Sequence, residues 1–297
     1  VALPTLEALL KSEHDLVSVI TQPDRPAGRG LTLKESPVAT WAKDRGITVH
    51  KPADQTEFKL AVRDTDLVIT IGFGVIIKEE ILNLPTHGFI NLHFSLLPRW
   101  RGAAPIHRAI LMGDEKTGVT IMRVVQKLDA GDMIKKTEIQ ISEKDTTEQL
   151  TKALAKLGAL LMIEVMDELS AKGELKSTPQ DEASVTYAEK VTKEESKIDW
   201  HNSSDVIARK IRAFNPFPVA QTEYREAVCK IWDAETGEDN DKNAKPGQFI
   251  KLDEFIHVKC GEGVLLIKEL QMPGGKRLKS KEFILGHRPI LGDVFKS

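Results

Sequence analysis

Three polar residues in the first half of the chain have the types and spacing that acyl-transfer chemistry uses. Asn91 and His93 lie two residues apart in the segment INLHF, and the acidic turn LDAGD contains Asp129. On a β-strand, side chains two residues apart point to the same side, so an amide and an imidazole would be presented together. Such a pair suits a site where negative charge develops on a carbonyl oxygen. If Asp129 folds beside His93, its carboxylate would orient the imidazole and stabilise its charged form.

The same residues also have a purely structural interpretation. Asn91 and His93 could both be hydrogen-bonded residues of an ordinary sheet, because motifs of this size are weak signals. The loop that follows them favours the functional interpretation. It reads SLLPRWRGAAPI, with two prolines, a glycine and an arginine on each side of Trp100. A plain strand connection does not require a rigid, cationic and aromatic loop.

Composition limits the class of protein. The chain has 297 residues, of which 41% are hydrophobic and 29% charged, as expected for a globular protein with room for two domains. Its apolar runs are shorter than the roughly 18 residues that a membrane span needs, so we expect no membrane partner. The net charge of −2 excludes a uniformly basic nucleic-acid binder but allows local basic patches. The two cysteines form neither a CxxC pair nor a metal set, which favours a reducing cytoplasm and no bound metal.

Strand-like and helix-like segments alternate through the first half of the chain. This alternation predicts an α/β fold with a doubly wound, mainly parallel, Rossmann-like sheet, whose ligands bind beyond the carboxyl ends of the strands. Because the first residues already have helical character, we expect a further strand to precede them. Asp145 and Glu148 are expected to form the capping box of a later helix. The predicted strands cover 16–22, 66–74, 88–94, 118–125 and part of 128–141, and the predicted helices cover 1–10, 36–46, 103–112 and 145–169.

The second half of the chain has a different pattern. A polar stretch with little periodicity begins near residue 171, and beyond it several short strands are separated by Gly, Asp and Asn. Strands of this kind predict a smaller antiparallel, OB-like β-barrel. The predicted division is a first domain over 1–177, a linker over 178–203 and a C-terminal domain over 204–297. The segment GGKRLKSK in that last domain could neutralise several phosphates, or it could be a solvated surface turn.

Several motifs resemble those of the folate-dependent formyltransferases, and together they span almost the whole chain. The resemblance implies transfer of a formyl group from 10-formyltetrahydrofolate to the α-amine of an aminoacylated initiator tRNA. It also implies that Asn91, His93 and Asp129 are the catalytic residues and that neither a metal nor a covalent nucleophile is needed. The motifs are N-x-H with SLLPRWRGAAPI, then TGVTIM, LDAGDM, TQPDRPAGRG, TYAEKVTKEESKIDW and RAFNPFP.

The resemblance further implies a folate pocket at the end of one strand and in the loop after His93. Glycines there would let backbone groups approach a flat pterin, although a plain strand-end turn would also explain either glycine. Phe73 and Phe94 stand where the family more often has Tyr and Gly. The residues that the resemblance assigns to folate are Gly72, Phe73, Gly74, Ser95, Leu96, Leu97 and Pro98.

For the nucleic acid, the resemblance implies contacts from the loop DRPAGRGLTLK and from the basic cluster of the barrel. These residues are Arg25, Arg29, Lys276, Arg277 and Lys279. We therefore expect a cytoplasmic monomer whose partners are aminoacylated initiator tRNA and the folate co-substrate. Three alternatives stay open: a formyltransferase for a small amine such as glycinamide ribonucleotide or an amino sugar, a folate-linked hydrolase, and a non-enzymatic RNA-binding protein. The last alternative leaves the N-x-H strand unexplained.

Overall fold

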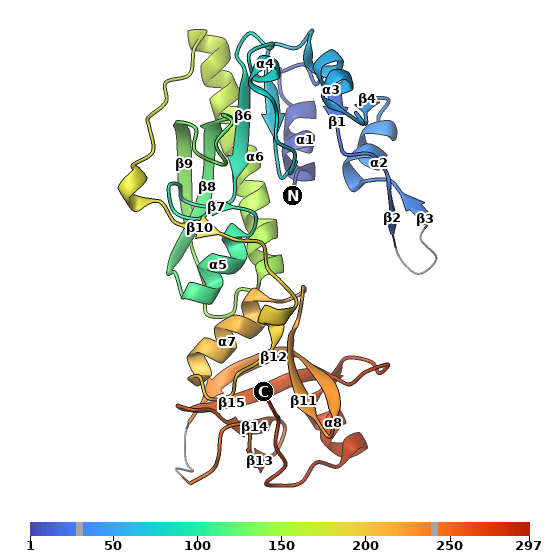
Figure 1. The fold of residues 1–297 in the computed structure, drawn as a ribbon, viewed down its shortest axis with the longest axis vertical. Coiled ribbons are helices and arrows are strands. Elements are labelled where there is room, and N and C mark those ends of the chain that lie inside the picture. Colours follow the sequence, from blue (N-terminus) through green and yellow to red (C-terminus); the bar gives the residue numbers. More distant parts are fainter. Residues whose placement is uncertain (28–31, 239–242) are drawn as a thin grey trace. The chain divides into compact units, whose positions relative to one another are not determined.

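The computed structural model describes residues 1–27, 32–238 and 243–297, which form two compact units (Figure 1). Residues 178–189, which fall inside the predicted linker, belong to the first unit. Within the described ranges, no helix is both long and apolar enough to cross a membrane. The first unit comprises residues 1–105, 116–140 and 151–189, and the second comprises 106–115, 141–150 and 190–297.

Strands of the first unit alternate with helices, which confirms the predicted α/β class with Rossmann-like parallel pairing. The connection between β8 and β9, residues 124–132, contains no helix, and antiparallel strands need no crossover helix between them. Antiparallel strands therefore extend one side of the parallel core. The pairs are β1 (Ser18–Ile20) with β4 (Thr48–His50) and β5 (Val68–Thr70) with β6 (Phe89–His93), both parallel, then β8 (Lys116–Arg123) antiparallel to β6 and β9 (Met133–Gln140) antiparallel to β8.

Helices pack on these strands, and the long helix α6 (Thr147–Lys172) lies directly against β6. A Cβ atom added at Gly158 would lie 2.6 Å from a methyl carbon of Leu92, so glycine permits this close approach. The first unit also contains two short strand pairs, β2 (Arg25–Ala27) with β3 (Thr32–Lys34) and β7 (Arg101–Gly102) with β10 (Tyr187–Ala188). Its other helices are α1 (Leu3–Leu10), α2 (Pro37–Lys43), α3 (Gln55–Val62), α4 (Glu79–Leu82) and the 3-10 turn η1 (Glu182–Ser184).

The capping box predicted for α6 is wrong by one residue. Thr146 and Gln149 form it, because the Gln149 N–H donates to the Thr146 hydroxyl at 3.3 Å and the Thr146 N–H donates to Gln149 Oε1 at 2.9 Å. Asp145 instead accepts a hydrogen bond of 2.7 Å from the Ser142 N–H. Its carboxylate therefore closes the turn that precedes the helix.

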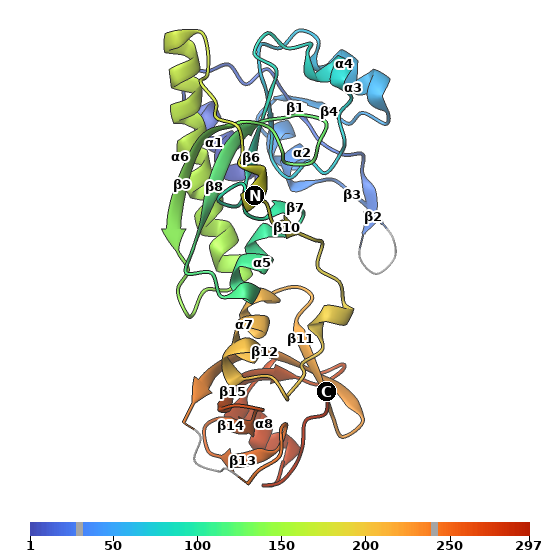
Figure 2. The ribbon, with the colours of Figure 1, turned by 60° about the vertical axis from the view of Figure 1, so that its left-hand side comes forward.

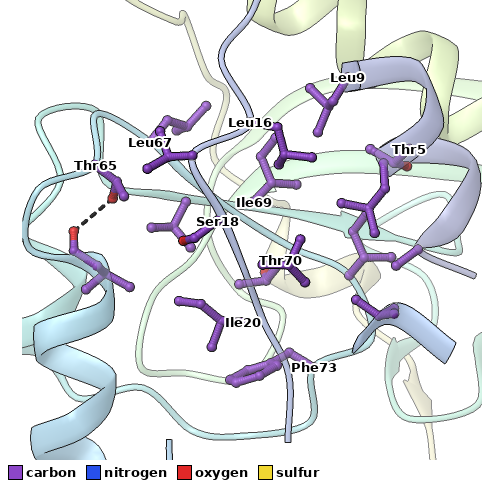
Figure 3. A pocket seen from close by; sticks show the side chains of 18 of the residues that line it. Thr5, Leu9, Leu16, Ser18, Ile20, Thr65, Leu67, Ile69, Thr70 and Phe73 are labelled. Atoms are coloured by element: carbon purple, nitrogen blue, oxygen red, sulfur yellow. Dashed lines mark hydrogen bonds between the residues drawn. The ribbon is translucent and has the colours of Figure 1, made fainter. Parts of the chain in front are cut away.

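An apolar cavity of about 1080 Å³ separates β1 from β5 (Figure 3). In the described part of the chain no backbone hydrogen bond joins these two strands, so each is paired along one edge only. The Gln22 side chain connects the two strand ends by donating to the Phe73 carbonyl at 2.7 Å. Apolar side chains from α1, from the two strands and from the segments beside them line the cavity, among them Leu9, Leu16, Ile20, Leu67 and Ile69.

The second unit contains an antiparallel sheet (Figure 2). Residues at the C-terminal end of the chain close it. Lys296 pairs with Glu223 on β11, and Val294 pairs with Gln248 beside β13, so both outer strands gain a partner. This closure confirms the predicted small antiparallel barrel. The strand order is β11 (Ala220–Tyr224), β12 (Ala227–Gly237), β15 (Val264–Gln271), β14 (Ile256–Lys259) and β13 (Phe249–Leu252), with β16 (Leu278–Lys279) paired to β15. The unit also contains the helices α7 (Ser204–Ala213) and α8 (Ser280–His287), the 3-10 turn η2 (Glu194–Ser196) and most of α5 (Pro105–Met112).

Candidate active site

Asn91 and His93 both lie on β6, which has neighbours on both sides. Thr70 of β5 is in register with Asn91, and Thr120 of β8 is in register with His93. Because the ladders on both edges fix its backbone, β6 presents the two side chains from a rigid strand. Asn91 is half-buried and His93 is buried.

The carboxamide of Asn91 is oriented by Thr70. The Thr70 hydroxyl donates to Asn91 Oδ1 at 2.9 Å, which directs the amide nitrogen away from that contact. Within residues 1–27, 32–238 and 243–297, the Asn91 amide nitrogen makes no hydrogen bond. Two N–H donors are therefore available to an oxygen atom of a ligand.

The imidazole of His93 lies between a carbonyl group and a carboxylate. Nε2 lies 2.8 Å from the Trp100 carbonyl oxygen, and since a carbonyl only accepts, Nε2 carries a proton. Nδ1 lies 3.6 Å from Asp129 Oδ2. The two ring nitrogens thus face two acceptor groups, the Trp100 carbonyl and the Asp129 carboxylate.

Asp129 lies in the turn between β8 and β9, with a left-handed φ of 46°. Its Oδ2 accepts a hydrogen bond of 2.8 Å from the Gly102 N–H, and its Oδ1 has no hydrogen-bond partner in the described chain. One carboxylate oxygen is thus fixed near His93 and the other is open to a proton or a water molecule. The structure satisfies the geometric condition that the sequence left open, because Asp129 folds beside His93.

The loop after β6 is held against β8 by Thr120. The buried Thr120 hydroxyl donates to the Ser95 carbonyl at 2.7 Å and accepts from the Leu97 N–H at 3.2 Å. Ser95 and Leu97 have no exposed surface, whereas Leu96 and Pro98 are half-buried. Of these four loop residues, Leu96 and Pro98 present surface to a ligand, and the other two give the loop its shape.

The turn after β5 follows Thr70, the partner of Asn91, and contains backbone N–H groups without a hydrogen bond inside the described chain. Gly72 and Gly74 have left-handed φ angles of 58° and 69°, so this turn favours glycine whether or not it binds a ligand. The N–H groups of residues 73–77 donate no hydrogen bond to another described residue. Phe73 packs its ring against Phe58 with the centroids 5.6 Å apart, which fixes the turn. A flat molecule with several heteroatoms would find free donors here.

The residues predicted to contact nucleic acid are spread over both units. Arg25 lies on β2, and Arg29 lies outside the described residues. Lys276, Arg277 and Lys279 are all exposed on the barrel unit. The Arg277 guanidinium forms an ion pair with Glu269 and lies 4.9 Å from the centroid of the Trp232 ring, so part of its charge is already used within the protein.

Sequence reasoning missed the residues that support the site. Thr70 and Thr120 are neighbours of the key residues across the sheet, which no local pattern reveals. Thr186 comes from a segment without periodicity, yet its hydroxyl accepts from the Trp100 N–H and its carbonyl accepts from the Arg101 N–H, both at 2.9 Å. These threonines position the loops around His93.

The set of groups assembled here is an amide, an imidazole, a carboxylate and open backbone N–H groups. It can stabilise negative charge on a carbonyl oxygen and move a proton from an attacking group. Among the residues that the structure describes, no group of three or more His, Cys, Asp or Glu side chains could hold a metal ion. The amide, the imidazole and the carboxylate together suit acyl transfer between two bound substrates.

Comparison with known proteins gives matches along the whole chain. Residues 2–166 match the family model described as formyl transferase, and residues 190–288 match that of the formyl transferase C-terminal domain. The chain is 47% identical to the methionyl-tRNA formyltransferase of Methylobacillus flagellatus, with 100% of this chain and 96% of that protein aligned. It is 44% identical to the methionyl-tRNA formyltransferase of Methylococcus capsulatus, over 96% of this chain and 94% of that protein.

Solved structures with a similar fold are more distant in sequence. The N-formyltransferase from Helicobacter canadensis, in complex with folinic acid and dTDP-3-aminofucose, has a TM-score of 0.68 at 20% identity, over 93% of this chain and 96% of that one. HypX from Aquifex aeolicus, in complex with tetrahydrofolic acid, has a TM-score of 0.64 at 18% identity, over 94% of this chain and 50% of that one.

Proposed function

This chain belongs to the formyl transferase family, and on that premise we propose that it formylates the α-amine of methionyl initiator tRNA. The formyl donor is 10-formyltetrahydrofolate, and the product is the formylmethionyl-tRNA with which translation begins. The observation that carries this proposal is the similarity, over nearly the full length of both chains, to proteins named methionyl-tRNA formyltransferase. The site on β6 supplies groups that suit the reaction.

The turn after β5 suits the folate donor. Its left-handed Gly72 and Gly74 and the free N–H groups of residues 73–77 offer backbone donors to a flat, heteroatom-rich ring system. We propose that this turn, including Phe73, and the loop from Ser95 to Pro98 hold the donor beside Asn91. The folate ligands of two solved structures with the same fold are in keeping with this assignment.

The proposed chemistry is a direct transfer. The amine nitrogen attacks the formyl carbon, and the formyl oxygen becomes an oxyanion that accepts from the Asn91 amide and is stabilised by protonated His93. The attacking nitrogen loses a proton to the open Oδ1 of Asp129, through water, and the folate nitrogen takes a proton as its bond to the formyl carbon breaks. Loss of one oxyanion donor in such sites slows turnover by about 10²–10³-fold.

The acceptor is proposed to use both units. Residues 1–177 would carry the chemistry, and residues 204–297 would contact the tRNA backbone through Lys276, Arg277 and Lys279. Arg25 and Arg29 would contact the tRNA from the first unit. We further propose that the protein acts as a cytoplasmic monomer.

The deciding experiment gives the full chain a choice of acceptors. The protein is incubated with 10-formyltetrahydrofolate and with either methionyl initiator tRNA, methionine methyl ester or an amino-sugar nucleotide, while formylated product and free formate are measured. We expect formyl transfer to the charged tRNA to be the fastest reaction by orders of magnitude. Release of formate without an acceptor, or faster transfer to the amino sugar, would replace the proposal with one of the alternatives. A His93→Ala variant, expected to lose at least about two orders of magnitude in turnover, shows that the signal comes from this site.

A further inference from the structure

Gln180 hydrogen-bonds to two loops of the candidate active site, although it contacts neither His93 nor Oδ1 of Asp129. The residue is 8% exposed. Its amide nitrogen donates to the carbonyl oxygens of Asp129 and Gly131, both at 2.8 Å. Its Oε1 accepts from Arg101 Nε at 2.9 Å. All three strong contacts of the carboxamide are therefore made inside the protein.

These contacts are specific for a carboxamide. The two N–H bonds face two carbonyl oxygens, which can only accept, and the amide oxygen faces a guanidinium, which can only donate. A flipped amide would place oxygen against oxygen. A carboxylate could keep the Arg101 contact but not the two contacts to the Asp129 turn. The side chain thus joins two partners of opposite hydrogen-bond character.

The two partners are the two loops that contact His93. Arg101 lies between Trp100, whose carbonyl accepts from His93 Nε2, and Gly102, whose N–H donates to Asp129 Oδ2. The other loop carries Asp129 itself. A closed ring of contacts results, which runs from the imidazole through the Trp100 loop, across Gln180 and through the Asp129 turn back to the imidazole.

The Asp129 turn depends on such a support. Asp129 has a left-handed φ of 46°, a conformation that Asp tolerates better than most non-glycine residues but that still costs free energy without support from its surroundings. Its neighbour Leu128 is 62% exposed and gives the turn little apolar anchoring. Two of the bonds that restrain the backbone of this turn come from Gln180. Without them the Gly102 N–H would still hold Oδ2, but the backbone that carries the carboxylate would be less restrained and its distance to Nδ1 of His93 would vary more.

We propose that Gln180 is a positioning residue for the formyl transfer: it sets the Asp129 carboxylate against His93 by joining the Asp129 turn to the Arg101 loop. This inference rests on the proposed function. The segment that carries Gln180 keeps other attachments, because Thr178 exchanges two backbone hydrogen bonds of 2.8 Å with Met133 and β10 pairs with β7. The role of Gln180 is therefore separable from the attachment of the segment.

The test uses two substitutions that differ in what they leave behind. Gln180→Glu keeps the acceptor for Arg101 and removes both donors to the Asp129 turn, whereas Gln180→Met removes all three bonds at similar size. Gln140→Glu, at the exposed end of β9, makes the same charge change away from the site and serves as the control. Turnover and Michaelis constants for folate and charged tRNA are measured, together with thermal unfolding.

We expect both Gln180 variants to lose about tenfold or more in kcat, with Michaelis constants within about twofold of the wild type and a retained cooperative unfolding transition. The control should resemble the wild type. The decisive readout is the combination with Asp129→Asn. If Gln180 acts through Asp129, adding Gln180→Met to that variant should cost almost nothing further, because the group it positions has already lost its charge.

The outcomes separate this inference from the proposed function. A wild-type protein that transfers no formyl group to any acceptor contradicts the proposed function. If the wild type is active, two results overturn the positioning role. One is a normal kcat in the Gln180 variants. The other is a kcat of the double variant that falls by the product of the two single-variant factors. Loss of folding in both Gln180 variants would also overturn it, since the residue would then belong to the stability of the fold.

Discussion

Replacing Asn91 by alanine tests the candidate site most directly, because its effects on chemistry and on stability should separate. The substitution removes the two N–H donors of the Asn91 carboxamide, which make no hydrogen bond within the described chain. It leaves the strand in place, since β5 and β8 pair with β6 along both edges. The carboxamide is lost and the backbone stays.

The expected magnitudes follow from the hydrogen bonds of the amide. Loss of one oxyanion donor costs about 3–4 kcal/mol of transition-state stabilisation, which corresponds to about 10²–10³-fold in kcat. The stability cost is about 1 kcal/mol or less, the usual worth of one hydrogen bond between neutral groups. It is small because the Thr70 hydroxyl, which now donates to Asn91, also lies 3.2 Å from the Ile90 carbonyl and can donate there instead.

The assay is steady-state formyl transfer to charged initiator tRNA, with thermal unfolding measured on the same preparations. Thr70→Val is the matched variant: it removes the hydroxyl that orients the amide but keeps the donors, so a loss of about 1 kcal/mol, or about fivefold, is expected. An Asn91→Ala protein with turnover within about threefold of the wild type would refute the role given to the amide. A Thr70→Val protein with a lower kcat than Asn91→Ala would refute the idea that Thr70 acts only by orienting the Asn91 amide.

Three further predictions concern charge. Hydrogen bonding from Arg101 lowers the pKa of Glu182 from 4.5 to about 2, so the stability that this pair provides is present above pH 4.5 and is lost as the pH falls toward 2. The melting temperatures of the wild type and of Glu182→Gln should therefore converge as the pH falls from 4.5 to 2. Melting temperatures that stay equally far apart over this range would contradict the pairing. Replacing Lys276 and Lys279 together by alanine should weaken tRNA binding. The slope of log affinity against log salt concentration should become shallower by about 0.7–0.9 for each phosphate that the protein no longer neutralises, and an unchanged slope would show that these lysines stay in solvent. Arg29→Ala, predicted from the sequence alone, should raise the Michaelis constant for charged tRNA several-fold and leave a methionine ester unaffected, and equal damage to both acceptors would argue against a tRNA contact.

The sequence indicated the strand that presents the site because β-structure has a simple period. Two polar residues spaced i and i+2 in an apolar run must share one side of a strand, and Asn91 and His93 lie on β6 as expected. The alternation of strands and helices likewise indicated the fold class. These features depend on residues close together in the sequence, so a single chain contains enough information to predict them.

The supports of the site depend on distant residues and gave no such signal. Gln180 and Thr186 come from a polar stretch without periodicity, and their partners near residue 100 and residue 130 are known only once the chain has folded. The capping box failed for a different reason. Both Asp145 with Glu148 and Thr146 with Gln149 fit the pattern, and the contact between Asp145 and the Ser142 N–H decides between them.

The cavity between β1 and β5 implies that local stability is unevenly distributed around the active site. β6, which carries Asn91 and His93, is hydrogen-bonded along both edges, whereas β5 is hydrogen-bonded along one edge and faces a space of about 1080 Å³ on the other. Segments with fewer partners open first, so amide protons of β5 should exchange with solvent sooner than those of β6. The turn proposed to hold the folate extends from β5. Asn91 and His93, two of the three residues proposed to be catalytic, thus lie on a strand that stays closed. The folate donor would bind beside a strand that opens readily, and its binding would protect that strand from exchange.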